Sequence, residues 1–187
     1  MSLKQTISGI RGIWGTDLND DTVKKHVLAL IHILPDRGCI IIGRDTRPSG
    51  KIIVDIFSGL LAEYGYDVID IGIVPTPTIE IATAYDENVI CGIAITASHN
   101  PSPYNGIKFL NERGMFFDAE TMMRIIEIYN DDSRLSLKKG NNLGRIVKRT
   151  YAPQLHIDRV LSLPWLPVDL IRSKKYNVLF DGNGGAG

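Results

Sequence analysis

An apolar run that stops abruptly in a polar loop is the feature that most constrains how this chain can fold. Residues 89–95 are all small or branched and apolar, whereas residues 96–105 carry hydroxyl, imidazole and amide groups. Such a run predicts a strand buried on both faces, and open α/β sheets present their sites where such strands end. We therefore take Ser98, three residues beyond this strand, as the centre of a candidate site.

The segments before this strand alternate between helical and strand patterns. Apolar periodicity, glycines and prolines predict helices over 20–34, 49–64 and 78–85, and strands over 39–43 and 66–71. Asp20 or Asp21 is the expected cap of the first helix and Ser49 that of the second. This alternation is the rhythm of βαβ units, which form parallel sheets with right-handed crossovers.

Later segments add to this framework. A short strand is predicted over 107–110, a hairpin turn at 111–114 leading into 115–117, a helix capped by Asp118 and running to 129, a loop over 130–142 and a helix over 151–163. Residues 8–12 have two glycines and are predicted as a turn. We expect a three-layer α/β/α domain with a mixed, mainly parallel sheet of about four strands.

Composition and charge exclude several classes of function. Basic and acidic residues both number 21, so the chain lacks the basic excess of a nucleic-acid-binding protein. No apolar run approaches the roughly 20 residues that cross a bilayer, and the first residues lack a signal-peptide profile. Cys39 and Cys91 lie in apolar runs without a Cys-x-x-Cys pattern, which favours packed thiols. We expect a cytoplasmic protein without nucleic-acid or membrane partners.

Three arginines near glycines are candidate phosphate ligands. Arg11 lies between two glycines, while Arg44 and Arg47 flank Asp45 between a strand and a helix. Arginine forks and helix N-termini both suit phosphate oxygens. The alternatives are a solvated arginine in a surface turn for Arg11, and for the other pair a surface ion pair worth about 0–1 kcal/mol.

Three interpretations of Ser98 are open. It could cap a turn, which is a common role of loop serines. It could be a hydrolase nucleophile, but we expect the ring of the adjacent His99 to point away from its hydroxyl, and the chain has no Gly-x-Ser-x-Gly elbow. It could instead carry a phosphoryl group, whose transfer needs positioning and cations such as those of Lys108, Arg11 and Arg44.

The loop resembles a family motif. Residues 96–101, Thr-Ala-Ser-His-Asn-Pro, and 104–108, Tyr-Asn-Gly-Ile-Lys, are similar to the phosphoserine loop of the α-D-phosphohexomutases, which include phosphoglucomutases, phosphomannomutases and phosphoglucosamine mutases. Residues 8–12, 43–50 and 72–77 also resemble segments of that family. Residues 4–7, Lys-Gln-Thr-Ile, depart from the Phe-Gly-Thr common in it.

The resemblance implies a mechanism and a set of residues. Phosphorylated Ser98 would pass its phosphoryl group to a hexose monophosphate, and the resulting hexose 1,6-bisphosphate would return its other phosphate, which interconverts sugar 1-phosphates and 6-phosphates. Lys108 would exchange the proton with the sugar hydroxyl, with Arg11 as a candidate partner. The catalytic set is Ser98, Lys108, Arg11 and His99, and the phosphate-binding set is Arg44, Asn100, Asn105 and Arg47.

The resemblance also implies a metal and further domains. One Mg²⁺ would be bound by the phosphate on Ser98 and by an Asp-x-Asp-x-Asp loop of a second domain, a motif that does not occur in this sequence. We expect residues 1–172 to form domain I with its linker helix. Residues 173–187 would be the first strand of a truncated second domain, because a strand without partners cannot bury its faces.

This chain, without the remaining domains, is therefore expected to fold but not to turn over substrate. The alternative from another functional class is a sugar-phosphate binding module without catalysis.

Overall fold

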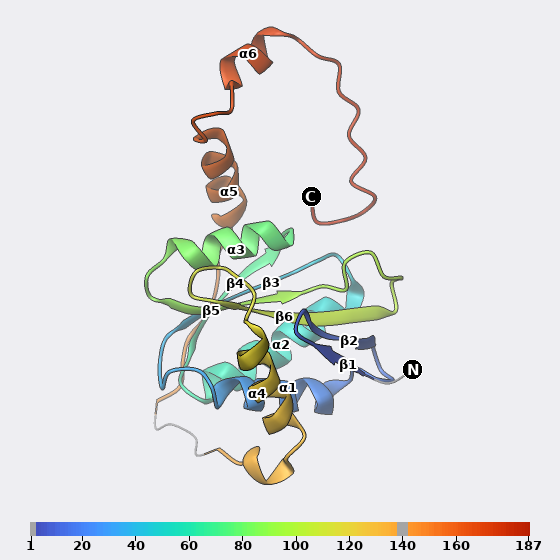
Figure 1. Cartoon of the computed structure of the whole chain (residues 1–187), viewed down its shortest axis with the longest axis vertical. Coiled ribbons are helices and arrows are strands. Elements are labelled where there is room, and N and C mark those ends of the chain that lie inside the picture. Colours follow the sequence, from blue (N-terminus) through green and yellow to red (C-terminus); the bar gives the residue numbers. More distant parts are fainter. Residues whose placement is uncertain (1–2, 138–141) are drawn as a thin grey trace.

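The computed structural model of the chain describes residues 3–137 and 142–187, and a mixed sheet of seven strands runs through its centre (Figure 1). The strand order is β1-β2-β6-β5-β3-β4-β7. The strands are β1 (Lys4–Thr6), β2 (Gly9–Ile13), β3 (Cys39–Arg44), β4 (Asp67–Ile73), β5 (Val89–Ile95), β6 (Tyr104–Asn111) and β7 (Ile146–Lys148). Pairing is parallel from β5 through β3 and β4 to β7, and antiparallel from β5 through β6 and β2 to β1.

The sheet has seven strands and not about four, and its parallel and antiparallel pairings are equal in number, so it is mixed but not mainly parallel. The four long strands β3, β4, β5 and β6 lie where strands were predicted, but β1, β2 and β7 were missed. β2 occupies the segment predicted as a glycine turn. Its pairing with β6 brings the backbones so close that a Cβ on Gly9, whose φ is +115°, would lie 2.4 Å from the Ile107 carbonyl oxygen. The chain reverses just before β2, through Ile7 and Ser8 between the paired residues Thr6 and Gly9, so the turn lies earlier than predicted, and Gly9 also permits the close approach to β6.

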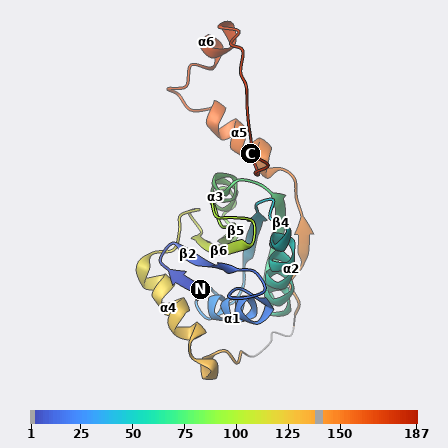
Figure 2. The same ribbon diagram turned by 90° about the vertical axis from the view of Figure 1, so that its right-hand side faces the viewer.

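Helices cover both faces of the sheet, as the three-layer prediction requires. α1, α2 and α4 lie on one face, and α3 lies on the other with α5 packed against it (Figure 2). The helices are α1 (Asp20–Ile31), α2 (Pro48–Glu63), α3 (Thr76–Tyr85), α4 (Ala119–Tyr129), α5 (Ala152–Leu161) and α6 (Val168–Ser173), with a 3₁₀ turn at Asp132–Arg134.

The core explains why the strand sequences are continuously apolar. Ile40 and Ile42 belong to the hydrophobic cluster under α1, α2 and α4, whereas Ile41 belongs to the cluster under α3. Successive side chains of a strand point to opposite faces, so both faces of β3 are covered. Each such fully buried side chain contributes about 1.5–3 kcal/mol of transfer free energy.

Two predicted helix caps were wrong and one is confirmed. Asn19, not an aspartate, caps α1, because its Oδ1 accepts from the Thr22 amide at 3.0 Å while the Thr22 hydroxyl accepts in return. α2 begins at Pro48 without a side-chain cap, which places Ser49 inside its first turn. Asp118 caps α4 as predicted.

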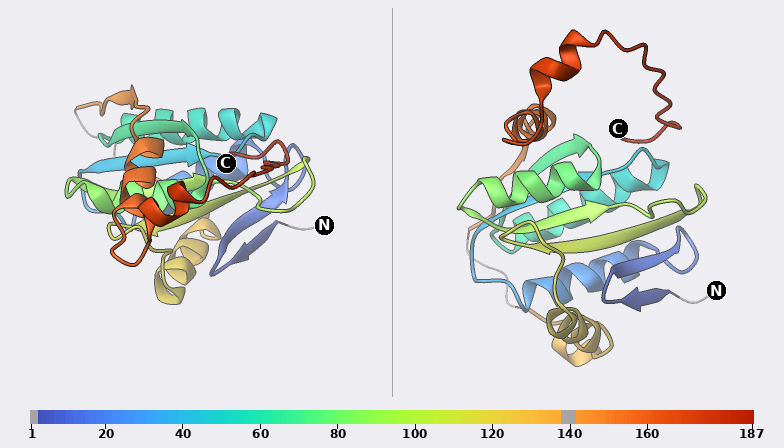
Figure 3. Two further views of the ribbon diagram at one scale, coloured as in Figure 1. Left: turned by 90° about the horizontal axis from the view of Figure 1, so that it is seen from above. Right: turned by 45° about the horizontal axis from the view of Figure 1, so that its top comes forward.

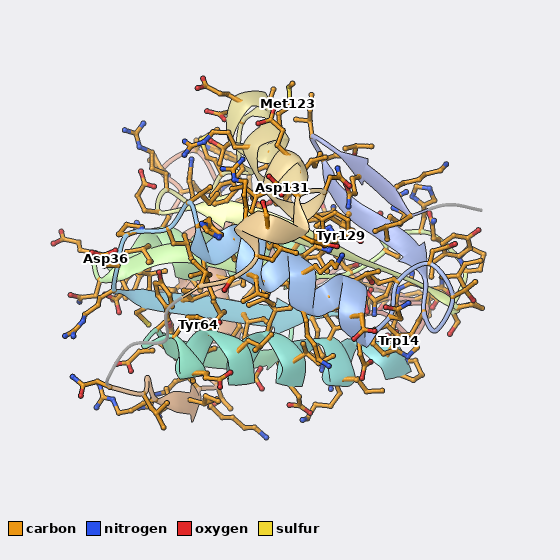
Figure 4. The ribbon with its side chains drawn as sticks, turned by 90° about the horizontal axis from the view of Figure 1, so that it is seen from below. Trp14, Asp36, Tyr64, Met123, Tyr129 and Asp131 are labelled. Atoms are coloured by element: carbon orange, nitrogen blue, oxygen red, sulfur yellow. The ribbon has the colours of Figure 1, made fainter. Side chains whose placement is uncertain are left out.

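α1 and α4 meet through a buried histidine. The His26 ring stacks on that of Tyr129, which lies between the two helices in Figure 4, with 4.1 Å between the ring centroids. The two ring nitrogens of His26 contact the Thr22 carbonyl at 2.6 Å and the Gln5 side chain at 3.1 Å. Burial lowers the pKa of His26 from 6.5 to about 4. The neutral ring is therefore a packed part of the core.

The last part of the chain extends away from the sheet and then returns to it (Figures 1 and 3). Thr78 Oγ1 on α3 lies 2.8 Å from His156 Nδ1 on α5. Residues 174–187 contain no helix or strand, so the segment expected as a strand is not paired here. Thr46 Oγ1 donates to the Gly184 carbonyl at 2.8 Å, which brings the end of the chain beside the loop after β3.

Three further expectations concern the cysteines, the membrane and the loop after α4. Both cysteines are free, and burial raises the pKa of Cys39 to about 11 and that of Cys91 to about 12, as packed thiols require. Among the described residues, no helix combines the length and apolarity needed to cross a bilayer. The predicted loop at 130–142 contains the 3₁₀ turn, and its residues 138–141 lie outside the described part.

Candidate functional site

The loop between β5 and β6 presents Ser98 to solvent. Two hydrogen bonds fold the loop back on itself, from the Ser98 amide to Thr96 Oγ1 at 3.0 Å and from the Asn100 amide to the Ala97 carbonyl at 3.1 Å. Ser98 has a φ of 56°, in the left-handed region that costs a non-glycine residue about 1–2 kcal/mol. Such a conformation persists only where the surroundings impose it.

Arg47 imposes much of that conformation. Its Nε donates to Asp45 Oδ2 at 2.9 Å, and the same carboxylate accepts from the Arg47 amide at 3.0 Å. Its terminal nitrogens donate to four loop carbonyls, those of Ser98 (2.9 Å), Asn100 (2.7 Å), Pro101 (2.7 Å) and Tyr104 (2.9 Å). The guanidinium predicted to bind phosphate therefore lies inside the loop, with its donors directed to protein oxygens.

Asn105 lies beneath the loop. Asn105 is fully buried. Its Nδ2 donates to Ser49 Oγ at 2.8 Å, and its Oδ1 accepts from the Gly106 amide at 2.8 Å. These contacts join the start of β6 to the first turn of α2. They place the side chain predicted to bind phosphate below the loop, not on its exposed surface.

A cavity of about 490 Å³ opens at the carboxyl ends of β3 and β5. The predicted residues that line it are Ser98, His99, Asn100, Arg44 and Arg47. Arg44 Nη1 donates to the Asp45 carbonyl at 3.0 Å. The first turn of α3 and residues 182–186 form other parts of the wall. The loop after β5, which carries the hydroxyl, and the segment from the end of β3 to the start of α2, which carries the arginines, thus share one cavity, as expected for neighbouring parallel strands.

Arg11 and Lys108 line a smaller hollow of about 140 Å³ next to this cavity. Arg11 on β2 pairs with Gly106 on β6, and Lys108 follows two residues later, so both side chains leave the same face of the sheet. Thr96 lines both spaces, and Arg11 Nη1 lies 3.4 Å from Asn100 Oδ1. Arg11 thus reaches the Ser98 loop, whereas Lys108 lies farther along β6, opposite Ala94 of β5, with its Nζ 5.3 Å from the centroid of the Phe116 ring.

Lys4 is a third cation of this hollow that sequence reasoning missed. It pairs with Arg11 across β1 and β2 and lines the hollow with the hydroxyl residues Thr6 and Ser8. Within residues 3–137 and 142–187, no carboxylate forms an ion pair with Lys4, Arg11 or Lys108. Unpaired cations on one face favour an anionic ligand. Recognition of the β1–β2 hairpin would have revealed this lysine.

The position of His99 corrects one expectation. Its ring does not point away from the hydroxyl, because Nδ1 lies 3.4 Å from Ser98 Oγ. The left-handed backbone at Ser98 turns the His99 side chain back toward that hydroxyl. This separation is longer than an effective hydroxyl-to-nitrogen bond. No carboxylate in the described part of the chain orients the ring. The set of nucleophile, base and orienting group that a serine hydrolase needs is therefore not assembled among those residues.

The described residues contain no group of three or more His, Cys, Asp or Glu side chains that could hold a metal ion. The Ser98 oxygen is the one predicted metal ligand of this chain, and it is exposed on the loop. A phosphate on that oxygen would supply the hard oxygen donor that Mg²⁺ prefers. It would need further ligands from outside these residues.

Comparison with known proteins agrees with this geometry. Residues 3–135 match the family model described as phosphoglucomutase/phosphomannomutase, alpha/beta/alpha domain I. A phosphoglucosamine mutase of Clostridioides difficile is 36% identical over 160 residues, covering 83% of this chain and 35% of its own length. A phosphoglucomutase/phosphomannomutase of Thermococcus kodakarensis is 35% identical over 184 residues, covering 96% of this chain and 39% of its own.

A solved structure gives the same picture. The crystal structure of a phosphoglucomutase/phosphomannomutase family protein from Burkholderia thailandensis is 26% identical with a TM-score of 0.66. The match covers 86% of this chain and 36% of that one. The chain thus spans between a third and two fifths of the length of the curated relatives described above.

Proposed function

Because this chain belongs to the phosphoglucomutase/phosphomannomutase family, as its α/β/α domain I, we propose that it is the phosphoryl-carrying domain of a hexose phosphomutase. The observation that carries the proposal is the position of Ser98. Its hydroxyl is exposed on a braced loop, beside a cavity that contains Arg44 and next to a hollow that contains Arg11 and Lys108.

In the proposed reaction the phosphoryl group moves between Ser98 and a sugar hydroxyl. The sugar oxygen attacks the phosphorus and the bond from phosphorus to Ser98 Oγ breaks. Lys108 relays the proton of the sugar hydroxyl to Ser98 Oγ, which leaves as a hydroxyl. The hexose 1,6-bisphosphate then returns its other phosphate to Ser98. Arg11 and Arg44 neutralise phosphoryl oxygens, and Asn100 and His99 orient the loop. Most of the catalysis comes from positioning and charge, as phosphoryl transfer requires.

The proposal includes one Mg²⁺, which the described residues cannot hold alone. When bound, the ion would neutralise charge on the phosphoryl oxygens. The phosphate on Ser98 would be its ligand from this chain, and carboxylates of a second domain would complete the site. We further propose that residues 1–172 form domain I, that residues 173–187 begin the second domain, and that the enzyme acts in the cytoplasm on a hexose phosphate.

The second candidate function is a sugar-phosphate binding module without catalysis, which the unpaired cations of the hollow would also suit. The discriminating experiment incubates the purified chain with glucose 1,6-bisphosphate and Mg²⁺, followed by intact-mass analysis and peptide mapping. We expect a single added phosphoryl group on Ser98, lost in Ser98→Ala and retained in Ser102→Ala, a matched control on the same cavity wall. Reversible binding without any covalent phosphate would favour the binding module instead.

A further inference from the structure

The loop carbonyls converge on one guanidinium. Four backbone oxygens between Ser98 and Tyr104 accept hydrogen bonds of 2.7–2.9 Å from Arg47, whose side chain is only 11% exposed. Asp45 holds the remaining Nε donor and is itself 18% exposed. Arg44, three residues earlier, has one hydrogen bond to a protein oxygen and lines the cavity. The two arginines of this segment are therefore directed to different targets.

Convergence of carbonyls has a consequence for the amide groups. No described peptide bond is cis, and in a trans peptide the carbonyl and the following N–H point in opposite directions. The Ser98 and Pro101 carbonyls point to Arg47, so the N–H groups of His99 and Ser102 point away from it. Both residues line the cavity beside Ser98. Backbone N–H groups that gather in the concavity of a turn bind anions, and these two residues border the same cavity as Ser98.

We propose that Arg47 is a positioning residue that converts this loop into a cradle for the phosphoryl group on Ser98. It does not contact phosphate, because its donors are engaged with protein oxygens and its side chain is almost buried. By holding the carbonyls inward, it keeps the N–H groups of His99 and Ser102 directed at the phosphoryl oxygens and maintains the left-handed turn at Ser98. The purpose of the cradle rests on the proposed phosphomutase function, whereas its geometry does not.

A lysine could not replace this arginine. The guanidinium is planar and rigid, and it presents separate N–H groups to four carbonyls and one carboxylate, while an ammonium is a compact charge with three donors. A lysine at position 47 would therefore keep the positive charge without keeping the loop in its conformation. This difference makes Arg47→Lys the informative variant, because it separates geometry from electrostatics.

The test compares Arg47→Lys and Arg47→Ala with the native chain and with Arg37→Lys, a control at an exposed arginine. Hydrogen exchange of the amides of residues 98–104 is the first readout. We expect exchange at Ser98, Asn100 and Tyr104, whose amides donate hydrogen bonds within the loop, to rise at least tenfold in both Arg47 variants, while exchange in β3 and β5 is unchanged. Unchanged exchange in the loop would overturn the proposal, whatever the function of the chain.

The second readout is the rate of phosphoryl transfer from glucose 1,6-bisphosphate to Ser98. We expect a fall of at least a hundredfold in both Arg47 variants and partial rescue of Arg47→Ala by millimolar methylguanidinium. A fall in rate without faster exchange would overturn the positioning role and assign direct phosphate contact. If the native chain accepts no phosphoryl group, the proposed function fails, and the exchange data still decide the role of Arg47.

Discussion

Replacement of Asn105 by alanine separates a structural role from direct phosphate binding. The Asn105 side chain is inaccessible to solvent, and its two hydrogen bonds of 2.8 Å join Ser49 Oγ to the amide of Gly106. Ser49 lies two residues after Arg47, so the bond ties β6 to the segment that holds the Ser98 loop. We expect Asn105→Ala to destabilise the whole fold and not only the site.

The magnitude follows from the groups that lose their partners. A buried donor or acceptor left unsatisfied costs about 1–3 kcal/mol, and this variant leaves one of each. Ser49 is 7% exposed and can rotate its hydroxyl toward another partner, so we take the lower end of this range as the cost of its lost hydrogen bond. The total is about 3 kcal/mol, which for a chain of this length lowers the melting temperature by about 6–12 °C. Ser49→Ala removes only one partner and should cost about 1–2 kcal/mol.

Urea unfolding of both single variants and of the double variant measures these costs. We expect the double variant to be less destabilised than the sum of the single ones by about 1 kcal/mol, because the two side chains share one bond. Asn88→Ala, at an exposed loop position, is the control and should stay within about 0.5 kcal/mol of the native chain. Native stability of Asn105→Ala together with weakened phosphate binding would refute the reasoning and restore the phosphate-binding prediction.

Two further perturbations test the core and the sheet. Burial lowers the pKa of His26 to about 4, so between pH 6.5 and 4 the unfolded state binds more protons than the folded state. The free energy of unfolding should therefore fall by up to about 3 kcal/mol as the pH decreases through that window. Urea unfolding at pH 7 and 4.5 should show this loss in His32→Gln but not in His26→Gln. A Cβ on Gly106 would lie 2.7 Å from the Ile10 carbonyl oxygen, so Gly106→Ala should cost about 1–3 kcal/mol by thermal unfolding. Gly59→Ala, in open space on α2, should be neutral or stabilising.

Strands β3, β4 and β5 of the parallel half could be predicted because their signals are local, whereas the three-residue edge strand β7 was missed. β3 and β5 are covered on both faces, so their sequences are continuously apolar, and the predicted bounds differ from the structure by at most one residue. The helices between them carry one buried stripe each; α2 ends just before Gly65, and α3 begins just after Pro75. Burial on a fixed side leaves the same pattern whatever the rest of the chain does.

In the antiparallel half, β6 was predicted, whereas β1 and β2 were not. β2 contains two glycines and gains its strand conformation from β6, roughly a hundred residues later in the chain. Lys4 was missed because the short hairpin between β1 and β2 was not recognised. In the candidate site, the residue types of Arg47 and Asn105 were visible in the sequence, but the direction of their donors was not. A motif records which groups are available, whereas only the folded backbone decides which of them face inward.

β5 joins the parallel and antiparallel halves of the sheet, and each half contributes a different part of the site. Parallel strands contribute side chains at their carboxyl ends, so Ser98 lies on the loop after β5 and Arg44 is the last residue of β3. Antiparallel strands contribute them from their faces, so Arg11 and Lys108 project from paired backbone. Strands hold side chains more precisely than loops do. A loop that must present a phosphoryl group against fixed cations therefore needs its own brace, which is the physical reason for a nearly buried arginine at position 47.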